Sequence, residues 1–259
     1  MIRDASRADL PLLTDLLRDA NDTPYDLARV AEEKCFGVGV NGEPRVRIWG
    51  DGEGVAVTCG KSLRILAVRR DARRRGIGAA LLDDTSATVA AAEAGNYFTP
   101  GIVTSDENTI NFLKKRGFEE TAQTQNLITT RLPDEIPAGV KTGDVGEFIE
   151  KHFGRIWRFE ASHAKTVFYV EEDGEVAGFS AHDANNRGLG FFGPTGVAKQ
   201  HRGKGLGRKL LLASLADMKR QGYERVVIPW TDALDFYARS CGAEVAHRFV
   251  TLARYIPQP

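Results

Sequence analysis

Thr195-Gly196-Val197-Ala198-Lys199-Gln200-His201-Arg202-Gly203-Lys204-Gly205-Leu206-Gly207-Arg208-Lys209-Leu210-Leu211-Leu212 is the stretch around which this sequence is organised. Its pattern indicates the end of a strand, a basic glycine-rich loop and the start of a helix. The alternate glycines let backbone N–H groups come close to a ligand. The helix that follows directs its unpaired N–H groups and the positive end of its dipole at the same place. The stretch therefore predicts an anion cradle, most naturally for phosphate groups.

Two common phosphate-binding motifs do not fit this loop. A Walker loop ends in Gly-Lys-Ser/Thr, whereas Lys204 is followed by Gly205. A dinucleotide fingerprint reads Gly-x-Gly-x-x-Gly, whereas the loop reads Gly-x-Gly-x-Gly. Residues 37–42 match that fingerprint literally, but they lead into Glu43-Pro44 rather than into a helix. We therefore predict no ligand for residues 37–42.

The loop occurs twice in the chain. Residues 73–82 superpose on residues 202–211 at a constant offset of 129, with the arginine, both motif glycines and both leucines in common, and Val68 falls on Val197 at the same offset. Downstream, residues 108–118 match residues 232–243, with one extra residue before the second glycine. Self-similarity at so long a period indicates duplicated domains rather than a solenoid.

The repeat predicts two domains in a chain of 259 residues. We place the first at residues 1–132 and the second at 140–259, with 133–139 as a linker because this charged stretch holds two prolines and a glycine. Each half alternates strand-like and helix-like segments. That alternation predicts an α/β or α+β fold, with a mixed sheet covered by helices on both sides.

The hydrophobic periodicity and turn residues predict the individual elements. A capping box of Ser6 and Asp9 should start the first helix. The other expected elements of the first half are strands at 45–49, 54–58, 63–68 and 97–103 and helices from 77 and over 108–116. Those of the second half are helices over 143–153 and 205–221 and strands at 166–170, 176–182, 189–197, 226–228 and 248–254.

Composition excludes several classes of function. The chain has 35 Lys and Arg against 35 Asp and Glu, so no overall field attracts nucleic acid or a membrane. The basic run 69–75 resembles a nucleic-acid patch, but its place between an apolar strand and a glycine loop favours phosphate binding. The three cysteines form no Cys-x-x-Cys pair, which argues against disulfides and a metal site. Without a signal-like start or a long apolar run, we expect a cytoplasmic protein.

Both loops and both downstream stretches resemble one known family. Arg-x-x-Gly-x-Gly from Arg202 to Gly207, after an apolar strand ending in Val197, resembles the acyl-CoA pyrophosphate loop of the GCN5-related N-acetyltransferase (GNAT) family. Residues 108–118 and 232–243 resemble its second motif, an Asn followed by an aromatic pair and a Gly-aromatic helix end. The resemblance implies two tandem GNAT-like domains, each a mixed, mostly antiparallel sheet flanked by helices. It also implies an enzyme that moves an acetyl group from acetyl-CoA directly to a primary amine.

The resemblance implies cofactor contacts in both halves. In the second half they are Val197, Ala198, Arg202, Gly203, Lys204, Gly205, Leu206, Gly207 and Arg208. In the first half they are Leu66, Val68, Arg73, Arg74, Arg75, Gly76, Ile77, Gly78, Ala79 and Asn108. A backbone N–H near Val197 is expected to stabilise the thioester oxygen, and such a donor contributes about 3 kcal/mol in comparable sites.

The same resemblance makes Tyr237 the expected catalytic acid. It aligns with a tyrosine that stands near the cofactor sulfur in many family members, and a phenol can donate a proton at neutral pH without being ionised. The aligned residue of the first half is Leu113, which cannot donate, although that half keeps Asn108 where the second has Asp232. We therefore expect the chemistry in the C-terminal half.

Other features leave alternatives open. The general base is not singled out among His182, Asp183, His163 and Glu160. The aromatic and histidine residues of 152–163 either pack in the core or form a lip for the acceptor. A non-catalytic acyl-CoA-binding or regulatory protein is the alternative function. The acceptor is a small amine, aminoglycoside, amino acid, polyamine or protein N-terminus, and we expect a monomer or a simple homodimer.

Overall fold

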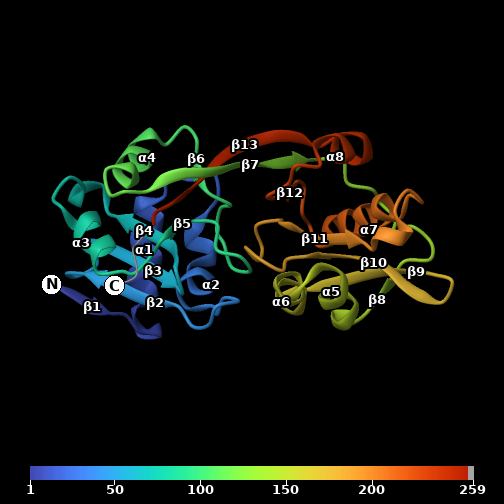
Figure 1. Cartoon of the computed structure of the whole chain (residues 1–259), viewed down its shortest axis with the longest axis horizontal. Helices are drawn as coiled ribbons and strands as arrows, with labels where there is room; N and C mark the ends of the chain where they lie inside the picture. The colour runs from blue at the N-terminus through green and yellow to red at the C-terminus, as the bar shows by residue number, and fades with distance from the viewer. Residues whose placement is uncertain (256–259) are drawn as a thin grey trace. The chain divides into compact units, whose positions relative to one another are not determined.

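The computed structural model describes residues 1–255 (Figure 1). Its residues cluster into two compact units. Unit 1 comprises residues 1–124 and the segment that begins at Arg248, and unit 2 comprises residues 125–247. The predicted mixed α/β fold is confirmed in each.

Unit 1 is built on a mostly antiparallel sheet. Strands β1 to β4 pair antiparallel in chain order, β5 joins β4 in parallel, and the end of β13 pairs antiparallel with β5 and β6. Their bounds are β1 Ile2–Asp4, β2 Arg45–Trp49, β3 Gly54–Cys59, β4 Ser62–Val68, β5 Val89–Ala90, β6 Ile102–Val103 and β13 Glu244–Ala253. The helices of this unit are α1 Leu10–Ala20, α2 Ala31–Phe36, α3 Ile77–Asp83 and α4 Glu107–Lys114.

The predicted start of the first helix is confirmed. The Ser6 N–H donates to Asp9 Oδ2 at 2.8 Å, which completes the capping box ahead of α1. The apolar face of α1 is fully buried at Leu13, Leu16 and Leu17. Helices α3 and α4 pack on the sheet in one cluster that includes Leu81, Leu113 and Phe118.

Unit 2 holds a four-stranded antiparallel sheet in the order β11-β10-β9-β8. The strands are β8 Lys141–Thr142, β9 Thr166–Glu172, β10 Glu175–His182 and β11 Phe192–Val197. A further strand, β12 (Val226–Ile228), pairs antiparallel with the end of β7 (Glu119–Thr129). The helices are α5 Gly146–Phe153, α6 Arg155–His163, α7 Leu206–Arg220 and α8 Leu234–Cys241.

Helices cover both faces of the sheet in unit 2, with α7 on one face and α5 and α6 on the other (Figure 1). Alternation along β10 explains the arrangement, because successive side chains point to opposite faces. Ala177 packs in a cluster with Leu206 and Leu210 of α7. Phe179, two residues on, packs instead with Ile149 of α5, because the pairing of β10 with β9 shifts register between Val176 and Gly178, at Ala177.

Two long strands are shared between the units. Residues 119–124 of β7 belong to unit 1 and residues 125–129 to unit 2, while β13 begins in unit 2 and ends in unit 1. Each sequence half thus supplies the end of its last strand to the other compact unit. The domain bounds predicted from the repeat do not include this exchange, because the sequence of a strand does not indicate which strand it pairs with.

Several elements differ from their predicted bounds. The strand expected over 97–103 is reduced to β6, because the preceding residues form an irregular segment in which Ala91 and Ala92 have positive φ. The helix expected from residue 143 begins at Gly146, and α6 was not predicted. The strand expected over 248–254 begins earlier, at Glu244.

Candidate active site

In both units the glycine-rich loop follows a strand that separates from its parallel neighbour. In unit 2, β11 meets β12 at one parallel bridge, Phe191 to Val227, and the described residues show no further pairing of these strands. In unit 1, β4 pairs with β5 only through Ser62 and Leu63. Each loop therefore starts where a strand end has a sheet partner on one side only.

Backbone N–H groups face each of these gaps. Ala198 donates its N–H to Ala177 O at 2.9 Å, so the neighbouring Val197 directs its own N–H and C=O away from β10, as alternation in an antiparallel pair requires. The same holds in unit 1, where Arg69 donates to Glu53 O at 2.8 Å and Val68 points away from β3. Leu66, two residues earlier on β4, has the same orientation as Val68.

In each loop the motif arginine donates a hydrogen bond to the backbone carbonyl of that same strand residue, Val197 or Val68. Arg202 Nε donates to Val197 O at 3.1 Å, and Arg73 Nε donates to Val68 O, also at 3.1 Å. Arg73 further pairs with Asp22 at 2.7 Å. These arginines therefore fix the start of the loop, and the N–H of Val197 or Val68 is left as the backbone donor that faces the gap.

The loop glycines are needed for their backbone conformation. Gly203 and Gly205 have φ of 83° and 78°, and the positions 129 residues earlier, Arg74 and Gly76, have φ of 65° and 83°. A Cβ added at Gly76, Gly203 or Gly205 would meet no protein atom within 4 Å. The space in front of both loops is therefore open, as a ligand cradle requires.

The next glycine has a different role, which is close packing. A Cβ on Gly207 would lie 3.7 Å from Val197 Cγ2 and 3.6 Å from the Phe236 ring, and one on Gly78 would lie 3.6 Å from Val68 Cγ2 and 3.7 Å from the Phe112 ring. The two copies therefore place the helix, the strand end and the downstream aromatic residue in the same relation.

The remaining predicted cofactor residues lie around the two loops. Leu206 and Ile77 begin α7 and α3 and are buried. Ala198 is buried with its N–H used by the sheet, Ala79 is half-buried on α3, and Asn108 is exposed on the first turn of α4. Lys204 pairs with Glu172 at 3.2 Å. Arg74, Arg75 and Arg208 are exposed, with no ion pair among the described residues.

Tyr237 is buried on α8, beside the loop helix. Its ring meets Phe236 and Phe192 edge-on, with centroids 4.9 and 6.3 Å away, and packs in a cluster with Leu211 and Leu215 of α7. It is 6% exposed, and burial raises its pKa, so the phenol keeps its proton at neutral pH. The aligned Leu113 is likewise buried in unit 1.

Residues of β7 hold both ends of the segment that carries Tyr237. Thr129 Oγ1 donates to Cys241 O at 2.6 Å, at the end of α8. Gln125 Nε2 donates to Thr231 O at 2.7 Å, before α8 begins. Sequence reasoning missed these contacts because residues 125–129 carry no motif and belong to the other half of the repeat.

The four candidate general bases make their contacts away from the glycine-rich loop. His182 pairs with Phe192, at the opposite end of β11 from Val197, and its Nε2 lies 2.9 Å from Asp217 Oδ2. Asp183 accepts from the Tyr223 hydroxyl at 3.0 Å. His163 Nδ1 lies 2.8 Å from Phe159 O, while Glu160 lies half-buried on α6. None of these contacts points to the loop.

The aromatic residues near α6 form part of the core. Phe153 and Trp157 stack with centroids 5.2 Å apart, and both contact Phe179. A Cβ on Gly196 would lie 2.5 Å from the Phe153 ring, so this glycine makes room for the aromatic ring. Core packing is therefore confirmed for Phe153 and Trp157, whereas Phe159 and His163 contact each other, with ring centroids 4.4 Å apart.

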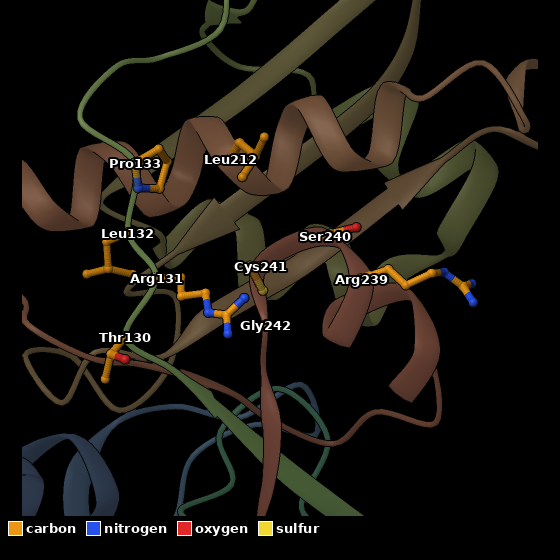
Figure 2. Close-up of a pocket in the computed structure, with 9 residues that line it drawn as sticks. All are labelled: Thr130, Arg131, Leu132, Pro133, Leu212, Arg239, Ser240, Cys241 and Gly242. Carbon is orange, nitrogen blue, oxygen red and sulfur yellow. The ribbon is translucent and has the colours of Figure 1, made fainter.

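Figure 2 shows a separate pocket in unit 2, of about 380 Å³. It is lined by Thr130, Arg131, Leu132, Pro133, Leu212, Arg239, Ser240, Cys241 and Gly242. None of the predicted site residues lines it. Arg131 covers Gly242, where a Cβ would lie 2.6 Å from its Nε, whereas Arg239 points away (Figure 2).

Residues 1–255 contain neither a group of side chains suited to a metal ion nor a membrane-spanning helix. No group of three or more His, Cys, Asp or Glu side chains in this range could hold a metal ion. No helix in this range is long and apolar enough to cross a membrane. In residues 37–42, Gly39 and Gly42 exchange backbone hydrogen bonds of 2.9 and 3.0 Å, which uses their amides within the turn.

Each of the two units thus has a separating strand pair, a loop with left-handed residues and a helix start, so the chain is a tandem repeat of one α/β unit. Models of the acetyltransferase (GNAT) family and of the acetyltransferase (GNAT) domain match residues 136–243 and 30–120, respectively. The chain belongs to the GNAT acetyltransferase family, as two tandem domains, and is an acyltransferase.

Solved structures share the fold across nearly the whole chain. A GCN5-related N-acetyltransferase from Sphaerobacter thermophilus is 18% identical with a TM-score of 0.67, covering 97% of this chain and 94% of its own. A tandem GNAT protein of the clavulanic acid biosynthesis pathway is 16% identical with a TM-score of 0.65, covering 100% and 99%.

A third structure is the GCN5-related glucosamine N-acetyltransferase region of a fungal multi-domain GH3 β-N-acetylglucosaminidase. It is 17% identical with a TM-score of 0.75, and the match covers 97% of this chain but spans only 38% of that protein. At these identities the likeness shows the fold alone. No curated protein matched the sequence.

Proposed function

We propose that this protein transfers an acetyl group from acetyl-CoA directly to a primary amine, and that the chemistry takes place in unit 2. The observation that supports the proposal is that unit 2 combines an open loop at Gly203–Gly205, a backbone N–H of Val197 facing the strand gap, and a protonated phenol at Tyr237, whose neighbour Phe236 lies against Gly207 of the loop helix. Unit 1 has the loop and the N–H but only Leu113 in place of the phenol.

Each group in unit 2 has a distinct role. The N–H groups of residues 203–208 hold the pyrophosphate, because the start of α7 leaves them without helical partners. Bound acetyl-CoA supplies an activated thioester. The Val197 N–H stabilises negative charge on the acyl oxygen, at about 3 kcal/mol. As the C–N bond forms and the C–S bond breaks, Tyr237 donates a proton to the departing sulfur and the amine releases one.

Unit 1 is proposed as a second acetyl-CoA site that lacks chemistry. Its loop residues 73–79, the strand residues Leu66 and Val68, and Asn108 are the contacts. Two differences support a binding role: Leu113 has no proton to donate, and α3 has 7 residues whereas α7 has 15. The alternative of an acyl-CoA-binding function without catalysis is thus favoured for this half only.

The acceptor is proposed to be a small-molecule amine. The solved glucosamine N-acetyltransferase region shares this fold, and its acceptor is an amino group, which supports an amine acceptor here. The cytoplasmic location and the monomer or simple homodimer stay predictions from the sequence.

Calorimetric titration with acetyl-CoA tests the proposal. Wild type should show two sites, of which Gly205→Glu removes one and Gly76→Glu the other, because a carboxylate side chain enters the open space of each cradle. Acetyl transfer to an amine should be lost with Gly205→Glu and retained with Gly76→Glu. Absence of acetyl-CoA binding in folded wild-type protein would refute the proposal, and loss of transfer only with Gly76→Glu would move the chemistry to unit 1.

A further inference from the structure

Trp230 differs from the other two tryptophans of the chain. Trp49 and Trp157 pack against apolar core clusters. Trp230 lies one residue beyond the end of β12, after Pro229, is 43% exposed and has a φ of 48°. A bulky residue in this left-handed region is strained, and such strain persists only where the surroundings impose it. The core does not require the strain, because nearly half of the side chain is outside it.

The surroundings that impose this conformation are polar groups of β7. Asn126 is fully buried, and its Oδ1 accepts the backbone N–H of Trp230 at 3.0 Å. Gln125 Nε2 donates to Thr231 O at 2.7 Å and to Asp232 Oδ1 at 3.3 Å. Two amide side chains therefore hold the backbone of Trp230 and Thr231 and the carboxylate of Asp232.

The position of residues 230–232 connects them to the proposed chemistry. They extend β12 at its carboxyl end, and β12 runs parallel to β11, whose carboxyl end leads into the glycine loop. In open α/β sheets, ligands bind in the crevice outside the carboxyl ends of strands that separate in this way. The helix that carries Tyr237 begins directly after them, at Leu234.

The charge of this segment is opposite to that of the loop. Asp232 is exposed, and the described residues give it no ion-pair partner. The loop across the gap carries Lys199, Arg202 and Lys204. A half-exposed indole and a carboxylate two residues apart in one segment suit a cation, because the ring attracts it through its quadrupole and the carboxylate through its charge.

We propose that residues 230–232 form the acceptor subsite and that it takes a diamine, holding one ammonium group between the Trp230 ring and the Asp232 carboxylate. This inference rests on the proposed function. The nitrogen that attacks a thioester must be unprotonated, whereas an ammonium held by a carboxylate keeps its proton. The acceptor therefore carries two amino groups, one that is held as the cation and one that is acetylated.

Binding of 1,4-diaminobutane to the full-length protein, followed by tryptophan fluorescence with and without CoA, tests this subsite. The uncharged isostere 1,4-butanediol is the ligand control. The diamine should give a saturable change that the diol does not give, and Trp230→Phe should abolish the change. Asp232→Asn should raise the diamine Kd roughly tenfold, since it removes the charge and keeps an oxygen for Gln125. Asp235→Asn, three residues on, removes the same charge and should change Kd less than twofold.

Several outcomes would overturn the subsite. They are an equal response to the diol, no saturable response to the diamine at millimolar concentration, or equal effects of Asp232→Asn and Asp235→Asn. Acetyl-CoA titration of the same variants separates the two proposals. If acetyl-CoA binds with wild-type affinity while the diamine does not bind, the subsite is wrong and the acetyltransferase function stands. If acetyl-CoA fails to bind wild type, the function itself is wrong.

Discussion

Replacing two glycines of the same loop by alanine should change stability in opposite directions. Gly205 has a φ of 78°, where an L-residue costs about 1–2 kcal/mol, and a Cβ there gains no contact because nothing lies within 4 Å. Gly207 lies inside α7 with ordinary helical geometry. A Cβ there would make van der Waals contacts at 3.6 and 3.7 Å, and alanine is favoured over glycine in helices by roughly 0.5–1 kcal/mol.

Urea denaturation of each variant measures the difference. Gly205→Ala should lower the free energy of unfolding by about 1–2 kcal/mol, and Gly207→Ala should raise it by about 0.5 kcal/mol. Gly76→Ala and Gly78→Ala form the matched pair in unit 1 and should repeat the two signs. If both members of a pair shift stability in the same direction by more than about 0.5 kcal/mol, the division into conformational and packing glycines is wrong.

Three further predictions concern the site and its support. Tyr237→Phe should lower kcat by about 10²-fold or more while the Kd for acetyl-CoA stays unchanged. Leu113→Met, the matched change in unit 1, should leave kcat unaltered. An unchanged kcat in Tyr237→Phe would show that the phenol takes no part in the mechanism. Thr129→Val should destabilise the protein by about 1–3 kcal/mol in urea denaturation, because the buried Cys241 carbonyl loses the 2.6 Å hydrogen bond from the Thr129 hydroxyl. Thr130→Val, at the exposed neighbouring residue, serves as the control. Hydrogen bonds from the Arg3 side chain and the Ser6 N–H lower the pKa of Asp9 to about 2. The Asp9 carboxylate therefore contributes to stability above pH 4, and this contribution is lost as the pH falls through 2. Over this pH range the thermal midpoint of Asp9→Asn should fall less than that of wild type.

The parts of the fold that sequence predicted best have strong local signals. Val226–Ile228 and Arg45–Trp49 match their predicted bounds, because short β-branched or alternating runs between turn residues leave little choice. The repeated motif correctly indicated that the same loop would form twice, whereas the hydrogen bond from each motif arginine to the strand carbonyl was not predicted.

The missed features depend on contacts between distant residues. Residues 97–101 do not form the first part of the strand predicted over 97–103. At its start, Asn96 and Tyr97 have oxygens that accept from the buried Lys34 ammonium at 2.8 and 2.9 Å, a pairing 62 and 63 residues apart in sequence. The support of α8 by Gln125 and Thr129 is of the same kind. No local pattern in residues 119–129 indicates that the strand continues into the other unit.

The sharing of β7 and β13 makes the two halves of this chain inseparable. A protease cut within residues 133–139 would leave the amino-terminal fragment with residues 127–129, which pair with β12, and the carboxyl-terminal fragment with residues 249–253, which pair with β5 and β6. Each fragment would thus complete the other, as in split-protein complementation. Deletion of either half would also remove paired strand residues from the half that remained. The exchange therefore gives the chain a structural reason to keep both halves.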